Sequence, residues 1–340
     1  NIPHRVIHTG QHLDLADPIL KLFEIEPDHS LKLMRHSQTP LELLQRLLAA
    51  LPEIVAPGNT SLVLVQGDTT TALAGALSAH HQQIPVAHLE AGLRSLDRSQ
   101  PFPEESNRTL ISHLADLHFA PTALARQNLI AERIPENSIH VTGNSVVDAL
   151  HMILNLSDLS TAEVRESYAT ENQKLILVTT HRRENMGEPL NQIVSAINTI
   201  VSELDDVVFV VPMHPNPRVR QAMKKLTLSP RIRTIDPLSY QNFIPMMAAA
   251  DLILTDSGGI QEEAPALGTP VFVLRNKTER PELIESGAGH LIGTDKDKIV
   301  HAVIGHFKTN RKPRPREIFG DGHTAERVVR LLNTYLTNMG

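Results

Sequence analysis

Two acidic turns, each placed directly after a short apolar run, constrain this chain more than any other feature. Asp68 follows the run 62–65, and Glu90 follows the run 85–89. Residues 70–81 between them have the pattern of a helix, so the segment predicts one strand-helix-strand unit. The carboxyl ends of adjacent parallel strands meet at one edge of a sheet, where open α/β sheets bind ligands. Two carboxylates at that edge indicate proton transfer, and therefore an enzyme.

Strand-like runs alternate with helical patterns along the whole chain, which predicts an α/β protein with doubly wound parallel sheets. The expected strands are, in chain order, 5–8, 61–65, 85–89, 117–120, 138–142, 174–180, 207–212, 231–235, 251–255 and 270–274. The polar stretch 156–173 interrupts the rhythm, so we place one α/β domain at 1–155 and a second at 174–318. A last helix is expected over 324–336, after a Pro- and Arg-rich crossover at 312–316.

Composition excludes several classes of protein. The chain has no cysteine, which rules out disulfides and thiolate catalysis and fits a cytoplasmic protein. A net charge of −6 gives no support to a nucleic-acid or membrane partner, and no apolar run approaches the ~20 residues of a membrane helix. The 18 histidines form no compact ligand cluster, so no catalytic metal is expected. Neither a Gly-x-Gly-x-x-Gly pattern nor a Walker loop occurs, which argues against NAD and ATP.

The second half carries a candidate nucleotide-binding turn. Strand 251–255 leads into the turn Asp256-Ser257-Gly258-Gly259, and a helix is expected over 260–267. Glycines at a helix start let backbone N–H groups approach a phosphate, and the helix dipole favours negative charge there. Glu263, one turn into the helix, could accept hydrogen bonds from ribose hydroxyls. An ordinary strand-to-helix turn explains the same segment equally well.

A basic turn follows another strand of the second half. His181-Arg182-Arg183-Glu184-Asn185 comes directly after the apolar run 175–180. One histidine and two arginines at the carboxyl end of a strand suit a pyrophosphate, to which arginine offers forked donors. The alternative is a solvated basic loop in which Glu184 pairs with a neighbouring arginine.

Pro103-Glu104-Glu105 offers a third acid near the first pair, although two glutamates at a helix start often only complement the helix dipole. Asp68 and Glu90 have structural interpretations as well. Asp68 could cap the threonine-rich helix that follows it, and Glu90 could pair with Arg94.

Taken together, these segments resemble the non-hydrolysing UDP-N-acetylglucosamine 2-epimerases. The matching stretches, which come in the family's order, are 9–12, 67–71, 90–94, 103–108, 180–185 and 256–265. The resemblance implies two Rossmann-like domains of the glycosyltransferase-B type with a cleft between them, a C-terminal segment 319–340 that returns to the first domain, a homodimer and no cofactor. It also implies reversible C2 epimerisation of UDP-GlcNAc to UDP-ManNAc, in which UDP is eliminated to give 2-acetamidoglucal and is then added back.

The resemblance also assigns site residues position by position. The catalytic set is Asp68, Glu90, Glu104 and His181, with the face of C2 that each carboxylate serves left open. The set that would bind UDP is Ser257, Gly258, Gly259, Glu263, Phe243 and Arg280. The set that would bind a second UDP-GlcNAc as activator is Gln11, His12, Gln38, Arg182 and His214. Two departures from the family's pattern, Asp14 and Ser37, count against the activator.

The family begins with a strand that ends in Gly-Thr-Arg-Pro-Glu, whose arginine contacts the diphosphate. This chain starts Asn1-Ile2-Pro3-His4, without such a segment. We therefore expect the natural N-terminus to lie upstream, and the chain as it stands to be weakly active or inactive, because loss of a central strand exposes sheet edges. Full turnover by a protein that starts at Asn1 would contradict this.

Other functions remain open at this stage. Within the family, a hydrolysing form would release free ManNAc, and a relative could act on another UDP-2-acetamido sugar. A retaining glycosyltransferase of the same architecture would need an acceptor and would not need three acids in the first domain. A non-catalytic UDP-sugar sensor would bind UDP-GlcNAc without turnover.

Overall fold

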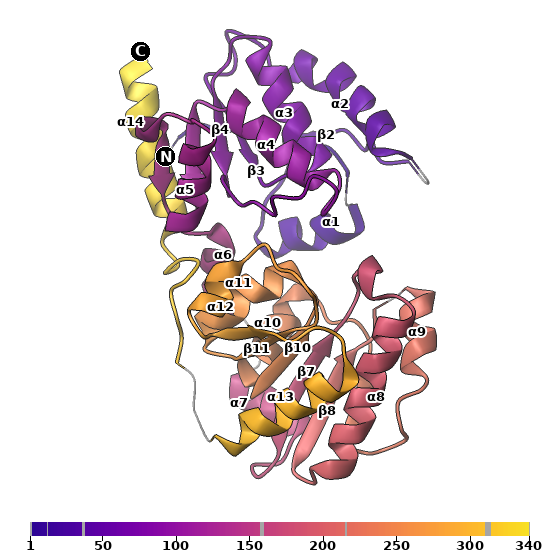
Figure 1. The fold of residues 1–340 in the computed structure, drawn as a ribbon. Coiled ribbons are helices and arrows are strands. Elements are labelled where there is room, and N and C mark those ends of the chain that lie inside the picture. Colours follow the sequence, from indigo (N-terminus) through magenta and orange to yellow (C-terminus); the bar gives the residue numbers. More distant parts are fainter. Residues whose placement is uncertain are drawn as a thin grey trace. The chain divides into compact units, whose positions relative to one another are not determined.

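The computed structural model describes residues 2–11, 13–35, 38–156, 160–214, 216–309 and 314–339. The chain divides into two compact units, each of which is described by itself (Figure 1). Unit 1 comprises Asn1–Ser145 together with Gly322–Gly340, and unit 2 comprises Val146–Asp321. The division therefore falls upstream of the polar stretch 156–173, which begins inside unit 2.

Unit 1 is built on a parallel four-stranded sheet in the order β3-β4-β5-β6. Its strands are β3 (Val63–Gln66), β4 (Val86–Leu89), β5 (Leu117–Ala120) and β6 (Ile139–Val141). Leu64 pairs with Ala87, and Ala87 pairs with Leu117 on the far side of β4. All four residues of β5 are buried, as expected for a parallel strand covered on both faces.

A second, two-stranded parallel sheet lies in the same unit. It pairs β1 (Ile7–His8) with β2 (His29–Ser30). The strand expected over 5–8 is thus confined to its last two residues. The partner β2 was not predicted, because two polar residues carry no strand pattern.

Helices cover the sheets of unit 1, and several begin at a side-chain cap. They are α1 (Leu13–Leu22), α2 (Pro40–Ile54), α3 (Thr70–His80), α4 (Glu104–Leu114), α5 (Ala123–Ala131) and the short η1 (Glu136–Ser138). Thr39 and Glu42 form a reciprocal capping box at α2, and Thr69 accepts from the Ala72 N–H at 3.2 Å to begin α3. An added Cβ on Gly75 would lie 3.0 Å from Val65 Cγ1, so the glycine lets α3 approach β3 closely.

The C-terminal helix α14 (Thr324–Met339) belongs to unit 1 (Figure 1). Its apolar stripe, Val328 and Leu332, packs into one core cluster with Leu117 and Phe119 of β5. The Arg327 guanidinium donates to the Thr142 carbonyl at 3.1 Å, which ties the start of α14 to the end of β6. The C-terminal helix therefore shares one core with the central sheet of unit 1.

Unit 2 contains a parallel six-stranded sheet in the order β12-β11-β10-β7-β8-β9. Its strands are β7 (Lys174–Thr179), β8 (Val207–Pro212), β9 (Ile232–Ile235), β10 (Leu252–Thr255), β11 (Val271–Val273) and β12 (Gly289–Leu291). The chain moves from β7 outward to β9 and then returns to the other side of β7 with β10. The direction of winding reverses between β7 and β10, and such a switch point opens a crevice at the carboxyl ends of the strands.

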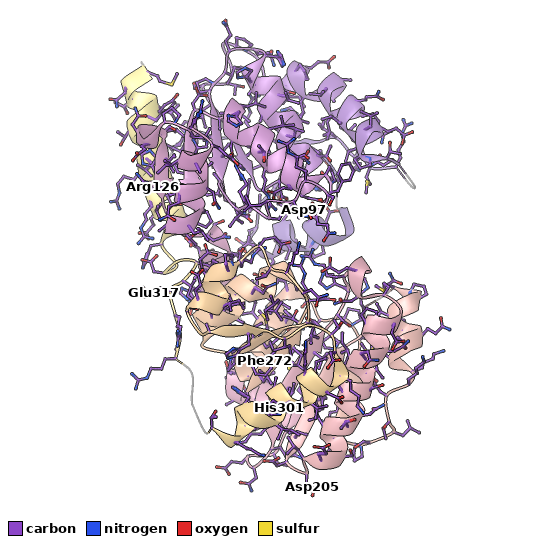
Figure 2. The ribbon with its side chains drawn as sticks, in the orientation of Figure 1. Asp97, Arg126, Asp205, Phe272, His301 and Glu317 are labelled. Carbon is purple, nitrogen blue, oxygen red and sulfur yellow. The ribbon has the colours of Figure 1, made fainter. Side chains whose placement is uncertain are left out.

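Helices cover the sheet of unit 2 as well. They are α6 (Ser145–Leu156), α7 (Thr161–Tyr168), η2 (Arg183–Asn185), α8 (Glu188–Glu203), α9 (Pro217–Met223), α10 (Tyr240–Ala249), α11 (Gly258–Leu267), α12 (Pro281–Glu285) and α13 (Lys296–Lys308). Ile193, Ile197 and Ile200 of α8 recur at helical spacing and are fully buried against the sheet. Phe272 on β11 lies in the same core (Figure 2). Within the described ranges, no helix has both the length and the apolar character that a bilayer span requires.

The packing of α14 generates a first prediction. Replacement of Leu332, which is 8% exposed, by alanine is expected to lower the unfolding free energy of unit 1 by about 2–4 kcal/mol, because it leaves a cavity beside β5. Val329→Ala on the same helix is the matched control: this side chain is 45% exposed, and the expected change is within about 0.5 kcal/mol. Native-state hydrogen exchange of the β5 amides at increasing urea measures both. Equal exchange in the two variants would show that α14 is not part of this core.

Candidate active site

The turn after β3 carries Asp68, and helix α4 holds it from two sides. The Arg108 guanidinium forms an ion pair with Asp68 Oδ2. The Asn107 side chain donates to the Asp68 carbonyl at 2.8 Å. Main chain and carboxylate are thus both held by neighbouring residues of one helix.

Arg108 also connects Asp68 to a buried glutamate. Its Nη1 donates to Glu105 Oε2 at 3.1 Å, and the side chains of both residues are almost fully buried. Glu105 in turn accepts from the backbone N–H groups of Ser95 and Leu96, at 3.0 and 3.1 Å. One guanidinium between two carboxylates, with main-chain donors on the second, satisfies charges that would be costly to bury alone. The network joins the turn at Asp68 to the loop after β4.

Glu90 follows β4 directly and has a left-handed backbone, with φ of 67°. Non-glycine residues rarely adopt this conformation, and it is concentrated at functional sites, where the surrounding structure holds it. The Glu90 Oε2 atom lies 3.7 Å from the position of a Cβ added to Gly67, so this carboxylate adjoins the turn that carries Asp68. The structure therefore brings the first two predicted acids together.

Two buried residues, one on each side of Glu90, fix the end of β4. His88 Nε2 lies 2.8 Å from the Gly67 carbonyl, and burial lowers the pKa of His88 to about 3, so the ring is neutral and donates this hydrogen bond. Gly92, with φ of 89°, is required because an added Cβ would lie 2.2 Å from the Ala125 carbonyl oxygen. The end of β4 is thus fixed on both sides of Glu90.

Glu104, the third predicted acid, is the first residue of α4 and is half-buried. It precedes Arg108 by four residues, and side chains at that spacing lie on one face of a helix. Glu104 therefore projects from the face of α4 that holds Asp68. Its neighbour Glu105 is instead buried and serves the loop at residues 95–96.

In unit 2, the predicted residues gather at the switch point between β7 and β10. Thr179 and Thr255, the last residues of these strands, are paired in register. The fully buried Asp256 then accepts from the backbone N–H groups of His181 and Arg182, both at 3.1 Å, and from the Asn185 side chain at 2.9 Å. Sequence reasoning placed Asp256 in the turn but gave it no role. The signal available in the sequence was that the turns at 181–185 and 256–259 each follow directly after a strand, which places the two turns side by side if the strands are neighbours.

Helix α11 begins at Gly258, two residues before the expected start at Ile260. Ser257 occupies the N-cap position without a side-chain hydrogen bond to the helix. An added Cβ on Gly258 would lie 3.1 Å from Arg280 Nη1 and 3.3 Å from Arg182 Nη2. A helix N-terminus faced by two guanidinium groups is suited to hold a phosphate or diphosphate.

Glu263 lies one turn further along α11 and is buried. The Tyr240 hydroxyl donates to Glu263 Oε1 at 2.6 Å, and burial together with the nearby carboxylate raises the pKa of Tyr240, so the hydroxyl keeps its proton. Burial raises the pKa of Glu263 to about 7, against the opposing effect of that hydrogen bond and with a smaller contribution from Glu262. Phe243, three residues after Tyr240 on α10, is half-buried on the same side of that helix.

His181 and His214 stack on each other, with ring centroids 5.8 Å apart and planes inclined by 18°. His214 Nδ1 accepts the Asn216 backbone N–H at 3.1 Å. These histidines follow the neighbouring strands β7 and β8. The structure therefore joins a predicted catalytic residue to one predicted for the activator.

Two other residues of the predicted activator set, Gln11 and Gln38, lie in unit 1. Gln11 Oε1 accepts from the Thr71 backbone N–H at 3.1 Å and from the Thr71 hydroxyl at 2.6 Å. Gln11 therefore lies at the start of α3, a part of the chain that follows Asp68 directly. The Gln38 side-chain oxygen Oε1 accepts the Arg35 backbone N–H at 3.1 Å. His12 lies outside the described residues. Across the described ranges, no group of three or more acidic or histidine side chains is arranged to hold a metal ion.

Parallel α/β units, one of them with two guanidinium groups beside a helix start at a switch point, are typical of nucleotide-binding enzymes with Rossmann-like domains. The sequence pattern of the UDP-N-acetylglucosamine 2-epimerase family matches residues 1–333. The chain is 44% identical to the UDP-N-acetylglucosamine 2-epimerase of Yersinia pestis, over 97% of this chain and 91% of that protein. The corresponding protein of Salmonella typhimurium is 43% identical, over 99% of this chain and 93% of the relative. The chain therefore belongs to the UDP-N-acetylglucosamine 2-epimerase family, whose members are isomerases.

Solved structures agree with this assignment. The UDP-GlcNAc 2-epimerase of Neisseria meningitidis bound to UDP-GlcNAc superposes with a TM-score of 0.89 at 37% identity, covering 98% of this chain and 92% of that one. The enzyme of Methanocaldococcus jannaschii in complex with UDP-GlcNAc and UDP gives 0.83 at 37% identity, with the same coverage of both chains. The predicted fold class, two Rossmann-like domains of the glycosyltransferase-B type, is confirmed.

The buried carboxyl of Glu263 generates a second prediction. Its pKa of about 7 lies above the ordinary 4.5, so ionisation costs more in the folded protein than in the unfolded chain. As the pH rises from 4.5 through 7, the wild type is therefore expected to lose about 2–4 kcal/mol of stability relative to Glu263→Gln, and the loss levels off about one pH unit above 7. Urea unfolding of both proteins at each pH measures the difference. A difference that stays constant between these limits would contradict it.

Proposed function

We propose that this protein catalyses the reversible C2 epimerisation of UDP-GlcNAc to UDP-ManNAc without net hydrolysis. The observation that carries the proposal is the convergence of Asp68 and Glu90 at the ends of adjacent parallel strands, in a chain of the 2-epimerase family. The relatives named UDP-N-acetylglucosamine 2-epimerase, and the Neisseria meningitidis structure bound to UDP-GlcNAc, support the same substrate here.

The chemistry explains why several acids are needed. The proton on C2 has no adjacent carbonyl to acidify it, so direct removal to a carbanion is too costly. In the elimination that we propose, a carboxylate takes the C2 proton while the electron pair of that bond forms the C1=C2 double bond. UDP leaves with the electron pair of the C1–O bond, and 2-acetamidoglucal remains. Protonation of C2 from the opposite face and return of UDP to C1 then give the epimer.

The carboxylates of unit 1 are proposed to supply this acid–base chemistry. Asp68 is held by Arg108 and Asn107, so its orientation does not have to be acquired when substrate binds. Glu90 adjoins the same turn, and Glu104 projects from the α4 face that holds Asp68. Which carboxylate serves which face of C2 stays open.

Unit 2 is proposed to hold UDP and to stabilise it as a leaving group. The backbone N–H groups at the start of α11, with Arg182 and Arg280 beside Gly258, would take the diphosphate. Glu263 would accept the ribose hydroxyls, and Phe243 would lie beside the uracil. Charge that develops on the departing oxygen would thus meet donors that are already in place.

Proton NMR of UDP-GlcNAc in D₂O tests the proposal, with protein near the substrate concentration so that slow turnover is detected. We expect the C2–H signal to disappear and the anomeric signal of UDP-ManNAc to appear, because the proton that returns to C2 comes from solvent. Asp68→Asn and Glu90→Gln are expected to slow exchange by about 10²- to 10⁴-fold. Glu136→Gln, which removes an exposed partner of Arg126, is the matched control and should exchange at the wild-type rate.

The other outcomes each contradict the proposal in a different way. Free ManNAc with UDP would identify a hydrolysing enzyme. Consumption of UDP-GlcNAc only after addition of a sugar or peptide acceptor would identify a glycosyltransferase. An unchanged spectrum, with UDP binding retained in calorimetry, would identify a protein that binds nucleotide-sugars without converting them, provided that a variant with an added N-terminal Gly-Thr-Arg-Pro-Glu segment is equally silent.

A further inference from the structure

The His181 ring lies between two titratable groups. On one side, its Nδ1 atom is 3.5 Å from Asp256 Oδ1. On the other, the His214 ring stacks on it at a centroid distance of 5.8 Å. The His181 side chain is 40% exposed, whereas Asp256 is fully buried. Nδ1 is the ring nitrogen nearer the carboxylate, so Nε2 is the one that remains for a ligand.

The charges beside the ring act in opposite directions. Burial lowers the pKa of His181 most, and Arg182 and His214 lower it further, while the Asp256 carboxylate raises it. Among the described residues, these groups come from three turns: Asp256 from the turn after β10, Arg182 from the turn after β7, and His214 from the turn after β8. Asp256 is therefore the only one of these neighbours that favours the protonated imidazole.

From this geometry we infer that Asp256 is a positioning residue for His181: its carboxylate keeps a proton on Nδ1, fixes the ring orientation and leaves Nε2 to meet the substrate. The inference rests on the function proposed above, in which His181 belongs to the catalytic set. It goes beyond that function, because it gives a role to a buried side chain that has no place in the acid–base or nucleotide-binding sets. A histidine oriented by a carboxylate on its other nitrogen is a recurring arrangement in catalysis.

The same carboxylate also fixes the loop that carries His181. Asp256 accepts the backbone N–H groups of His181 and Arg182, and the Asn185 side chain donates both to Asp256 Oδ2 at 2.9 Å and to the Leu274 carbonyl at 3.0 Å. A test must therefore separate the effect on the ring from the effect on the loop. Asn185→Ala loosens the loop but leaves the carboxylate beside His181, and this makes it the matched control for Asp256→Asn.

The tautomer of His181 in the wild-type protein provides the first test, and it needs neither a variant nor turnover. We expect the neutral ring to carry its proton on Nδ1, as read from long-range ¹H–¹⁵N correlations of ¹⁵N-histidine-labelled protein, with the signal assigned by its loss in His181→Gln. In Asp256→Asn the His181 pKa should fall and the tautomer preference should be lost. In Asn185→Ala both should stay as in the wild type. A wild-type ring with its proton on Nε2, or equal pKa shifts in the two variants, would overturn the inference.

A double-mutant cycle provides the second test. Asp256→Asn and His181→Gln are each expected to lower the rate of C2 deuterium exchange by about 10²- to 10⁴-fold, with KM changed less than threefold. The double variant should be no slower than the slower single variant, because Asp256 acts through His181. Losses that multiply would show that Asp256 acts independently of His181. Absence of exchange in the wild type would instead contradict the proposed function, and the tautomer measurement would still decide the role of Asp256.

Discussion

In each unit a buried carboxylate fixes a loop of the candidate site, and the neighbouring side chains of that site are held through it. In unit 1, Glu105 accepts two backbone N–H groups and pairs with Arg108, which in turn fixes Asp68. In unit 2, Asp256 accepts two backbone N–H groups and faces His181. Removal of a carboxylate from water is costly unless several donors replace its hydration. A turn that shifted would leave the buried carboxylate without these donors. The cost of burying the carboxylate therefore also fixes the geometry of the turn.

The sequence predicted the architecture well wherever apolar residues accumulate. The predicted bounds of β5 and β8 match the structure, and α3 begins at the predicted residue. Apolar strand runs and a helix cap can be recognised from a few neighbouring residues. The strands β2 and β12 escaped prediction. They are only two and three residues long, and their pairing is set by neighbours rather than by their own pattern. The two units divide after Ser145, at the first residue of α6, whereas the predicted boundary lies at 155, because no break in the helical pattern marks that point in the sequence.

The candidate site was predicted residue by residue but not as a set of contacts. Strand ends identified Asp68, Glu90 and the turn at Asp256, because parallel strands collect their carboxyl ends at one edge. The supporting contacts were not foreseen: Arg108 reaches Asp68 across 40 residues, and Tyr240 reaches Glu263 across 23. Such pairs depend on helix placement and side-chain direction, which a single sequence does not encode locally. The left-handed backbone of Glu90 was likewise invisible, since nothing in its side chain requires it.

Arg182 belongs to the predicted activator set but lies beside the predicted diphosphate-binding turn. The family resemblance places it with a second, activating nucleotide-sugar. Its Nη2 lies 3.3 Å from the position of a Cβ added to Gly258, and Arg280 Nη1 lies 3.1 Å from that same position. In the proposed function, these two guanidinium groups at the start of α11 bind the diphosphate of the first ligand. A second ligand that used Arg182 would have to share this guanidinium with the first. Binding at the two sites would then be coupled through one side chain, and the coupling would act equally in both directions.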